Sequence, residues 1–206
     1  MKKLFLTSSF KDVSGLLADF EGNLKGKTVT FIPTASIVED VTFFVNSGKK
    51  ALEKSGLAVD VLEISTAGSD EISTKLKSND FIYVTGGNTF FLLQELKRTG
   101  ADKIIIEEVN AGKLYIGESA GSIVVSPDIE YIKEMDEAQK APRLTGFGGL
   151  NLVDFYTVPH YTNVPFKKIA HKIADTYSST LNLLPISNHE AILVENGKVN
   201  KVSSKS

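Results

Sequence analysis

The chain has 206 residues, with 23 Lys and Arg against 25 Asp and Glu, so its formal net charge is −2. Hydrophobic residues make up 42% and charged residues 23%, as is usual for a globular domain with a buried core. A near-neutral chain without a basic tract is not expected to bind nucleic acid. The sequence contains no cysteine, which excludes disulfides, thiolate metal sites and a cysteine nucleophile, and suits a reducing cytoplasm.

Neither a signal peptide nor a membrane-spanning segment is predicted. The N-terminal region has two lysines but only a three-residue apolar run, 4–6, whereas a signal peptide needs roughly 7–15 apolar residues. No apolar span of 18 residues occurs in the sequence. We expect a soluble cytoplasmic protein, monomeric or homodimeric, whose partners do not include membranes.

Short apolar segments rich in Val, Ile and Phe alternate with longer segments of helical period. The predicted strands are 4–9, 28–36, 58–64, 80–87, 113–117, 151–160 and 182–187. The predicted helices are 13–24, 38–56, 69–78, 88–99, 101–111 and 164–180. The core stripe expected in the second helix consists of Val41, Phe44, Val45 and Leu52. A C-terminal hairpin over 191–203 is predicted to turn at Asn196 and Gly197.

Strand–helix alternation at this spacing predicts βαβ crossovers. The expected fold is therefore α/β: one domain over 1–206, with a mostly parallel sheet, helices on both faces and a C-terminal hairpin. The pattern loosens over 127–151, which is predicted to be a long loop or small subdomain. Loops of that length in a compact domain are usually functional or disordered.

The strongest chemical signal is Gly-Glu-Ser-Ala-Gly at 117–121, a G-x-S-x-G pattern directly after an apolar strand. A serine on a sharp strand-to-helix turn directs its hydroxyl out of the sheet end, and the flanking glycines relieve crowding. The backbone N–H of Ala120 can then donate to a developing oxyanion. The alternative is a turn of small residues without chemistry, but the strand–helix context favours Ser119 as a nucleophile.

A second glycine turn, 85–88, ends another predicted strand and opens a helix. Parallel strands present their C-terminal ends at one edge of the sheet, where ligands bind in open α/β folds. Gly86 and Gly87 are therefore expected beside Ser119, with the N–H of Gly87 as a second oxyanion donor. An ordinary turn capped by Asn88 fits this stretch equally well when it is taken alone.

A serine nucleophile needs a base, and the sequence offers three histidines: His160, His171 and His189. His160 ends a strand-like run after Pro159, so it is expected at the edge where Ser119 lies. His171 falls in the middle of a predicted helix beside lysines and is expected on the surface. His189 precedes the last hairpin and stays an alternative base.

These patterns do not identify the acidic residue that would orient the base. Glu134 and Asp136 lie in the long loop 127–151, and Glu190 follows the strand 182–187. A single acidic residue on such a loop is more often a solvated surface charge. Glu118 is next to the nucleophile, but its side chain is expected to point away from that of Ser119.

Three segments, VTGGNTFFLL, GESAGS and GGLNLVDFYTVPHY, resemble in order and spacing the serine peptidases of family S51. That family includes the aspartyl dipeptidases (dipeptidase E) and the cyanophycinases. The resemblance runs over about residues 1–200. It implies a flavodoxin-like or class I glutamine amidotransferase-like sandwich, and a serine peptidase that hydrolyses short peptides without a metal or organic cofactor.

When the family's residue roles are transferred through these motifs, the resemblance implies that Ser119 is the nucleophile and His160 the base. It also implies that the N–H groups of Gly87 and Ala120 bind the oxyanion. For the third member of the triad, Glu134 falls best in register. The family's acid has also been assigned to a second region, near the C-terminal loop. In that region this chain has Asn188 at the aligned position, and Glu190 follows two residues later. An asparagine can orient an imidazole but cannot stabilise imidazolium by charge, so Glu134 is preferred.

This chain departs from the family pattern before the nucleophile, where it has Glu118 and relatives often have Trp or Thr. A carboxylate there can repel an acidic substrate side chain or attract an N-terminal amine. If the substrate is acidic, Lys140 or Arg143 is the candidate cationic contact. Two rival functions stay open: a serine esterase or amidase, and a catalytically inactive ligand-binding protein.

Overall fold

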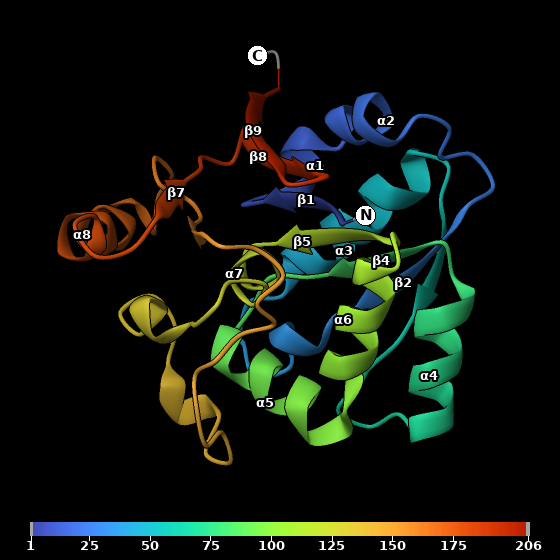
Figure 1. Ribbon diagram of the computed structural model, residues 1–206, viewed down its shortest axis with the longest axis horizontal. Coiled ribbons are helices and arrows are strands. Elements are labelled where there is room, and N and C mark those ends of the chain that lie inside the picture. The colour runs from blue at the N-terminus through green and yellow to red at the C-terminus, as the bar shows by residue number, and fades with distance from the viewer. Residues whose placement is uncertain (1, 205–206) are drawn as a thin grey trace.

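The computed structural model describes residues 2–204 and is built around a seven-stranded sheet (Figure 1). The order across this sheet is β3-β2-β4-β5-β1-β8-β9. Its strands are β1 (Lys3–Thr7), β2 (Thr28–Ile32), β3 (Ala58–Val61), β4 (Phe81–Val84), β5 (Leu114–Glu118), β8 (Glu190–Glu195) and β9 (Lys198–Ser203). A separate two-stranded sheet contains β6 (Tyr156–Val158) and β7 (Leu183–Pro185).

The first five strands pair in parallel, and the last two are antiparallel, as the sequence predicted. The hairpin of β8 and β9 turns at Asn196 and Gly197, whose φ angles are 52° and 80°. Two consecutive residues with positive φ form the tight turn that matches the right-handed twist of paired strands. The result is a parallel α/β sheet whose edge is closed by an antiparallel hairpin.

Helices cover both faces of the sheet. They are α1 (Phe10–Val13), α2 (Gly15–Glu21), α3 (Phe43–Lys54), α4 (Ser69–Ser78), α5 (Thr89–Thr99), α6 (Ala101–Asn110), α7 (Ala120–Ile123) and α8 (Lys167–Tyr177). In Figure 1, α2 lies above the sheet and α4, α5 and α6 lie below it. Among the described residues, no helix is both long enough and apolar enough to cross a bilayer.

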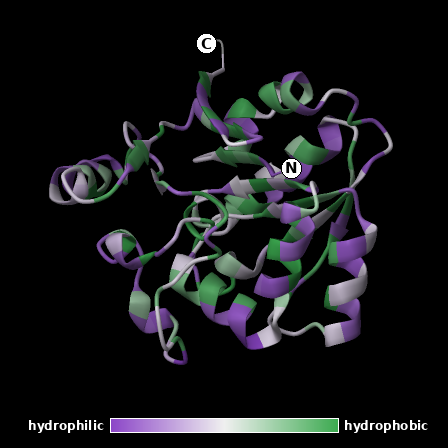
Figure 2. Ribbon diagram, in the orientation of Figure 1, coloured by the Kyte–Doolittle hydropathy of each residue, from purple (hydrophilic) through white to green (hydrophobic). Residues whose placement is uncertain are grey.

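Alternating side chains of the central strands belong to two separate hydrophobic cores, one on each face of the sheet. In β1, Leu4 and Leu6 join the core beneath α4, α5 and α6, whereas Phe5 joins the core beneath α1, α2 and α3. This alternation follows from the two-residue period of a strand. Figure 2 shows the hydrophobic colour gathered on the strands and the hydrophilic colour on the outer sides of the lower helices.

Local signals explain several helix boundaries. The Asn88 side chain accepts a hydrogen bond from the N–H of Phe91 at 2.9 Å and so caps the start of α5. Gly100 has a φ of 77° and separates α5 from α6 in the left-handed conformation that glycine adopts without strain. The predicted helix 69–78 coincides with α4.

Three expected elements differ from the structure. The helix predicted over 38–56 starts only at Phe43, and Val41, expected in its core stripe, is 58% exposed. That part of the prediction was wrong because residues 38–42 still belong to the loop that follows β2. The helix predicted over 13–24 begins earlier and is divided into α1 and α2. The strand predicted over 151–160 forms only β6, outside the main sheet.

The long loop 127–151 packs against the body of the protein. Short 3-10 turns occur at Glu130–Ile132 and Ala138–Lys140, and Ile129, Tyr131 and Leu150 are buried. The Asp136 carboxylate accepts hydrogen bonds from the N–H and hydroxyl of Thr89. Burial raises the pKa of Asp136 to about 6, although these hydrogen bonds oppose the increase. The loop is therefore anchored at the start of α5.

Candidate active site

Three parallel strands end together at one edge of the main sheet. Leu6 of β1 and Val84 of β4 both pair with Gly117 of β5, so the loops after these strands start side by side. The three loops carry Ser8, the Gly86–Gly87 turn and Ser119. The sheet thus brings the serine and the glycine turn together at its carboxyl edge, as open α/β folds do for their ligands.

Ser119 occupies a strained turn between β5 and α7. Its φ is 49° and its ψ is −105°, a region that residues with a side chain rarely adopt. Its N–H donates to the carbonyl of Thr7 at 2.8 Å, which holds the turn against β1. The Ser122 hydroxyl also links the two strands, since it donates to the carbonyl of Gly117 and accepts from the N–H of Thr7. This is the geometry of a nucleophile elbow.

The ring of His160 connects Ser119 to Asn188. Nε2 of His160 lies 3.1 Å from Oγ of Ser119, and Nδ1 lies 2.7 Å from Oδ1 of Asn188. An amide oxygen accepts hydrogen bonds, so Nδ1 carries the proton and the lone pair of Nε2 faces the serine. That tautomer can accept a proton from the hydroxyl of Ser119.

The small sheet places His160 and Asn188 next to each other. β6 and β7 pair in parallel with Val158 opposite Pro185, so the residues that follow both strands emerge on the same side. His160 has a φ of 58°, and its N–H donates to Oγ of Ser8 at 2.9 Å. The Ser8 hydroxyl in turn donates to the carbonyl of Ile186. Ser8 therefore joins the end of β1 to the loop that carries His160.

Two further side chains support this arrangement. The Asn163 side chain accepts from the N–H of Asn188 at 2.9 Å, and the N–H of Asn163 donates to the carbonyl of His160. The ring of Phe166 stacks on that of His160 with 5.1 Å between centroids. No motif in the sequence indicated Ser8, Asn163 or Phe166, because their roles depend on contacts between distant segments. Burial lowers the pKa of His160, partly opposed by the hydrogen bond to Asn188.

The two expected oxyanion donors are Ala120, which follows Ser119, and Gly87, which follows Gly86, a residue whose built Cβ would lie 3.2 Å from Cβ of Ser119. Ala120 is the first residue of α7, so its N–H has no partner within the helix. Within residues 2–204 no hydrogen bond is made by the N–H of Gly87 or of Ala120. Gly87 has a φ of 130°, and a Cβ there would lie 2.2 Å from the carbonyl oxygen of Ala35. Only glycine fits at this point of the turn.

Glu134 is not brought to the histidine. Its carboxylate forms an ion pair with Lys172 at 2.6 Å, and its side chain is 46% exposed. The position beside Nδ1 of His160 is occupied by Asn188 instead. The alternative acid, Glu190, accepts from the N–H of Ser187 and pairs with Lys201. The group that contacts Nδ1 of His160 is thus an amide rather than a carboxylate.

The other two histidines have different surroundings. The ring of His171 stacks on Tyr161 with 4.2 Å between centroids, and His189 is exposed next to the C-terminal strand. Residues 2–204 hold no group of three or more His, Asp or Glu side chains placed to bind a metal ion. The cations Lys140 and Arg143, expected as contacts for an acidic substrate, form ion pairs with Glu39 and Glu95 respectively.

Glu118 points away from Ser119, as predicted, into the core beneath α1 and α3. It is 4% exposed, and its two oxygens accept from the N–H of Phe10 at 2.9 Å and the hydroxyl of Tyr83 at 2.7 Å. Burial raises the pKa of Glu118, whereas these hydrogen bonds lower it. The carboxylate therefore joins the loop after β1 to β4.

We expect Glu118→Ala to lower the free energy of unfolding by about 3 kcal/mol, because it leaves a buried N–H and a buried hydroxyl unsatisfied. Glu118→Gln retains an acceptor for Phe10 and should cost less. Because the folded-state pKa is raised, the stabilisation by Glu118 is largest in acid and is lost as pH rises through that pKa. The stability of Glu118→Gln relative to wild type should therefore improve from acidic to neutral pH.

Urea denaturation at several pH values tests this expectation. Glu53→Ala is the matched control, since Glu53 is half exposed on α3 and its pair with Lys49 spans 4.0 Å. That variant should change stability by no more than about 0.5 kcal/mol. Equal losses of unfolding free energy in Glu118→Ala and Glu53→Ala would show that the Glu118 carboxylate does not stabilise the contact between β4 and the loop after β1.

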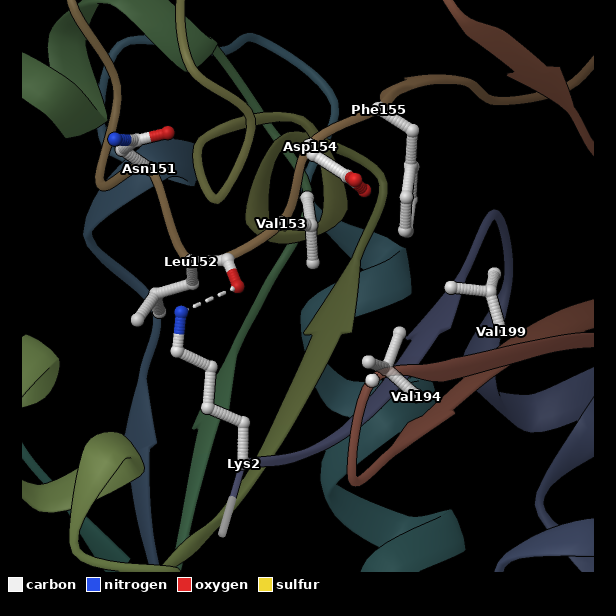
Figure 3. Close-up of a pocket in the computed structure, with 9 residues that line it drawn as sticks. Lys2, Asn151, Leu152, Val153, Asp154, Phe155, Val194 and Val199 are labelled. Carbon is white, nitrogen blue, oxygen red and sulfur yellow. Dashed lines mark hydrogen bonds between the residues drawn. The ribbon is translucent and has the colours of Figure 1, made fainter.

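A cavity of about 270 Å³ lies elsewhere, toward the amino end of β1. Figure 3 shows it between Lys2, the segment 151–155 and the β8–β9 hairpin. Lys2 Nζ donates to the carbonyl of Leu152 at 3.1 Å across it. The residues that line this cavity do not include Ser119 or His160, so it is separate from the serine–histidine site.

Comparison with known proteins shows the family to which the chain belongs. The model of Peptidase family S51 matches residues 4–202. An uncharacterised peptidase of Listeria innocua is 65% identical over 199 residues, which cover 97% of this chain and 95% of the relative. A Peptidase E of a Nostoc species is 33% identical over 137 residues, 66% of this chain and 53% of the relative. The crystal structure of a candidate Peptidase E protein from Listeria monocytogenes has a TM-score of 0.96 and 62% identity, with both chains fully covered. The chain therefore belongs to peptidase family S51 and is a serine-type peptidase.

Proposed function

We propose that the protein hydrolyses short peptides, with Ser119 as nucleophile, His160 as general base and Asn188 as the residue that orients the base. The observation that carries this proposal is the chain of contacts from Oγ of Ser119 to His160 at 3.1 Å and from His160 to Asn188 at 2.7 Å. Relatives named Peptidase E support a peptide substrate. This assignment replaces the expected Glu134 with Asn188.

The proposed reaction has two halves. Nε2 of His160 takes the hydroxyl proton as Oγ of Ser119 attacks the scissile carbonyl carbon, and the N–H groups of Gly87 and Ala120 hold the oxyanion. The C–N bond breaks, His160 gives its proton to the leaving amine, and an acyl-enzyme remains. Water then attacks the ester with His160 as base, which releases the acid and restores the serine.

An amide beside Nδ1 has a defined consequence for this mechanism. Asn188 fixes the tautomer of His160 but adds no negative charge, and burial lowers the pKa of the ring. The base is therefore neutral at neutral pH, as proton abstraction requires. The imidazolium formed in the transition state is less stabilised than it would be beside a carboxylate.

The first test is intact-protein mass spectrometry after reaction with a fluorophosphonate, followed by assay of dipeptides. We expect one adduct on the wild type, no adduct on Ser119→Ala and slow labelling of His160→Ala. Ser179→Ala, which changes an exposed serine after α8, should label like the wild type. Failure of the wild type to label would favour a ligand-binding protein. Turnover of esters far above that of any peptide would favour an esterase.

The pH profile provides a second prediction. In the wild type, kcat/KM should rise with an apparent pKa below 6.5, because protonated His160 cannot act as a base and burial favours its neutral form. Asn188→Asp places a carboxylate beside Nδ1, so the acid limb should move to higher pH and kcat should rise about tenfold. Asn188→Ala should lower kcat without moving the limb upward.

Asn182→Asp is the control for the added charge, because Asn182 is exposed at the start of β7 rather than beside the ring. Its profile should match that of the wild type. An unchanged acid limb in Asn188→Asp would show that residue 188 does not contact the catalytic base in solution.

A further inference from the structure

Exposed apolar side chains are concentrated in the segment that follows β2. Among the described residues, six large hydrophobic side chains are exposed: Ile37, Val41, Phe43, Val61, Val164 and Val199. Three of them fall within the seven residues 37–43, with exposed fractions of 51%, 58% and 67%. A fourth, Val164, lies in the loop that follows His160. Single exposed hydrophobics are ordinary, but a cluster beside a reactive group indicates a binding surface.

The fold places the stretch 37–44 against the oxyanion turn. This stretch follows β2, whose neighbour β4 carries the Gly86–Gly87 turn. The carbonyl of Ala35 accepts from the N–H of Asn88 at 2.8 Å, so the two loops are directly bonded. The start of this stretch is therefore fixed beside the turn proposed to bind the scissile carbonyl oxygen.

Phe44 comes closest to the nucleophile. A Cβ placed on Gly86 would lie 3.2 Å from Cβ of Ser119 and 3.7 Å from the ring of Phe44. The serine and the ring are thus both within van der Waals reach of one point. Phe43 meets Phe44 edge to face at 6.2 Å between centroids. The aromatic pair forms a wall beside Ser119, with one ring half-buried and the other exposed.

The opposite side of the site is also apolar. Phe166 stacks on His160, and Val164, two residues before it, is 87% exposed. The two cations expected to contact an acidic substrate are already paired, since Lys140 contacts Glu39 and Arg143 contacts Glu95. The surroundings of Ser119 therefore suit an apolar side chain better than a carboxylate.

We propose that Phe44, with Phe43 beside it, forms a subsite that selects a large apolar side chain next to the scissile bond. This inference rests on the proposed peptidase function and names its substrate class: dipeptides that contain a residue such as leucine or phenylalanine. Removal of that side chain from water against the aromatic wall supplies the selectivity. The expected preference over an acidic residue is about 10- to 100-fold in kcat/KM.

The experiment compares two series of dipeptides, Xaa-Ala and Ala-Xaa, with Leu, Phe, Ala or Asp as Xaa. We expect Leu and Phe to exceed Asp at least tenfold in one series. Phe44→Ser should reduce that ratio below threefold, whereas Phe44→Leu should retain most of it. Val199→Ser removes an exposed apolar side chain from the distant edge strand β9 and should leave the ratio unchanged.

Phe43→Ser covers the case in which Phe44→Ser fails to fold, because the 67% exposed ring of Phe43 contributes little to the core. It should also lower the ratio, by at least twofold. Analytical ultracentrifugation of the same variants tests the competing role of this surface. A dimer that dissociates in Phe43→Ser, with an unchanged ratio, would overturn the subsite and make the patch an interface between copies.

Labelling of Ser119 by a fluorophosphonate separates failure of the subsite from failure of the proposed function. An adduct together with a preference for Asp, or a ratio that Phe44→Ser leaves unchanged, would overturn the subsite alone. No adduct and no hydrolysis of either series would overturn the proposed function and the subsite with it. An adduct, a preference for Leu or Phe and its loss in Phe44→Ser are the results expected.

Discussion

Ser119→Ala and His160→Ala should each lower kcat for a dipeptide substrate by a factor on the order of 10⁴ to 10⁶. In the proposed mechanism the serine supplies the bond-forming atom, and the histidine, 3.1 Å away, removes its proton. Neither group would then act without the other. The double variant should therefore be no slower than the slower single variant, and this non-additivity is the signature of a nucleophile–base pair.

Steady-state and single-turnover assays on the two single variants and the double variant test this prediction. Thermal unfolding serves as the control for structure, because both side chains are only partly buried. Ser179→Ala should keep full activity. Multiplicative losses in the double variant would mean that Ser119 and His160 act in different steps, and the proposed mechanism would then fail.

The order and type of most elements could be predicted because the signals are local. Each apolar strand and each amphipathic helix can be recognised from a short run of consecutive residues. The helix α4, for example, matches its predicted range. The break between α5 and α6 follows from Gly100 alone, whose left-handed conformation is costly for other residues. Such signals need no knowledge of the tertiary structure.

The contact between Asn188 and His160 could not be predicted from local patterns, although the family resemblance places Asn188 in one of the two positions considered for the third residue. Asn188 meets His160 because β6 and β7, each only three residues long, pair in parallel across an intervening helix. Nothing in either short strand specifies that pairing. Preference for a charged group then favoured Glu134, whose carboxylate pairs with Lys172 in the structure. Chemical type alone is a weak guide where the contact depends on long-range topology.

Val41 shows that helical periodicity alone does not predict which apolar residues are buried. It fits the apolar stripe of the helix that follows, yet α3 starts at Phe43 and Val41 is exposed. Periodicity cannot distinguish a core residue from an apolar residue that faces a ligand, since both types recur at the same spacing. The proposed subsite beside Ser119 would account for apolar residues that the core does not bury.

We expect Gly121→Ala to lower the free energy of unfolding by about 3 kcal/mol or more, and the melting temperature by about 6–12 °C. A Cβ at this position would lie 2.3 Å from the carbonyl oxygen of Val84 and 3.0 Å from its Cβ. Backbone atoms of a central strand cannot move aside. The turn of α7 must shift away from β4 instead, which displaces the N–H of Ala120 from Gly87 and should abolish labelling of Ser119.

Gly15→Ala is the matched control. Gly15 begins α2, has no heavy atom within 4 Å of its built Cβ and does not have a positive φ. Alanine favours the helix there, so the variant should be as stable as the wild type or up to about 1 kcal/mol more stable. Urea denaturation of both variants compares the same chemical change in a crowded and in an open position.

The same contacts explain the spacing of the G-x-S-x-G pattern. A Cβ on Gly117 would lie 2.6 Å from the carbonyl oxygen of Gly121, and one on Gly121 would meet Val84. The left-handed conformation belongs to Ser119, not to either glycine. The glycines are thus required by close packing, which holds a strained serine against two strands. A Gly121→Ala variant with unchanged stability and labelling would show that the elbow tolerates a looser fit than these distances allow.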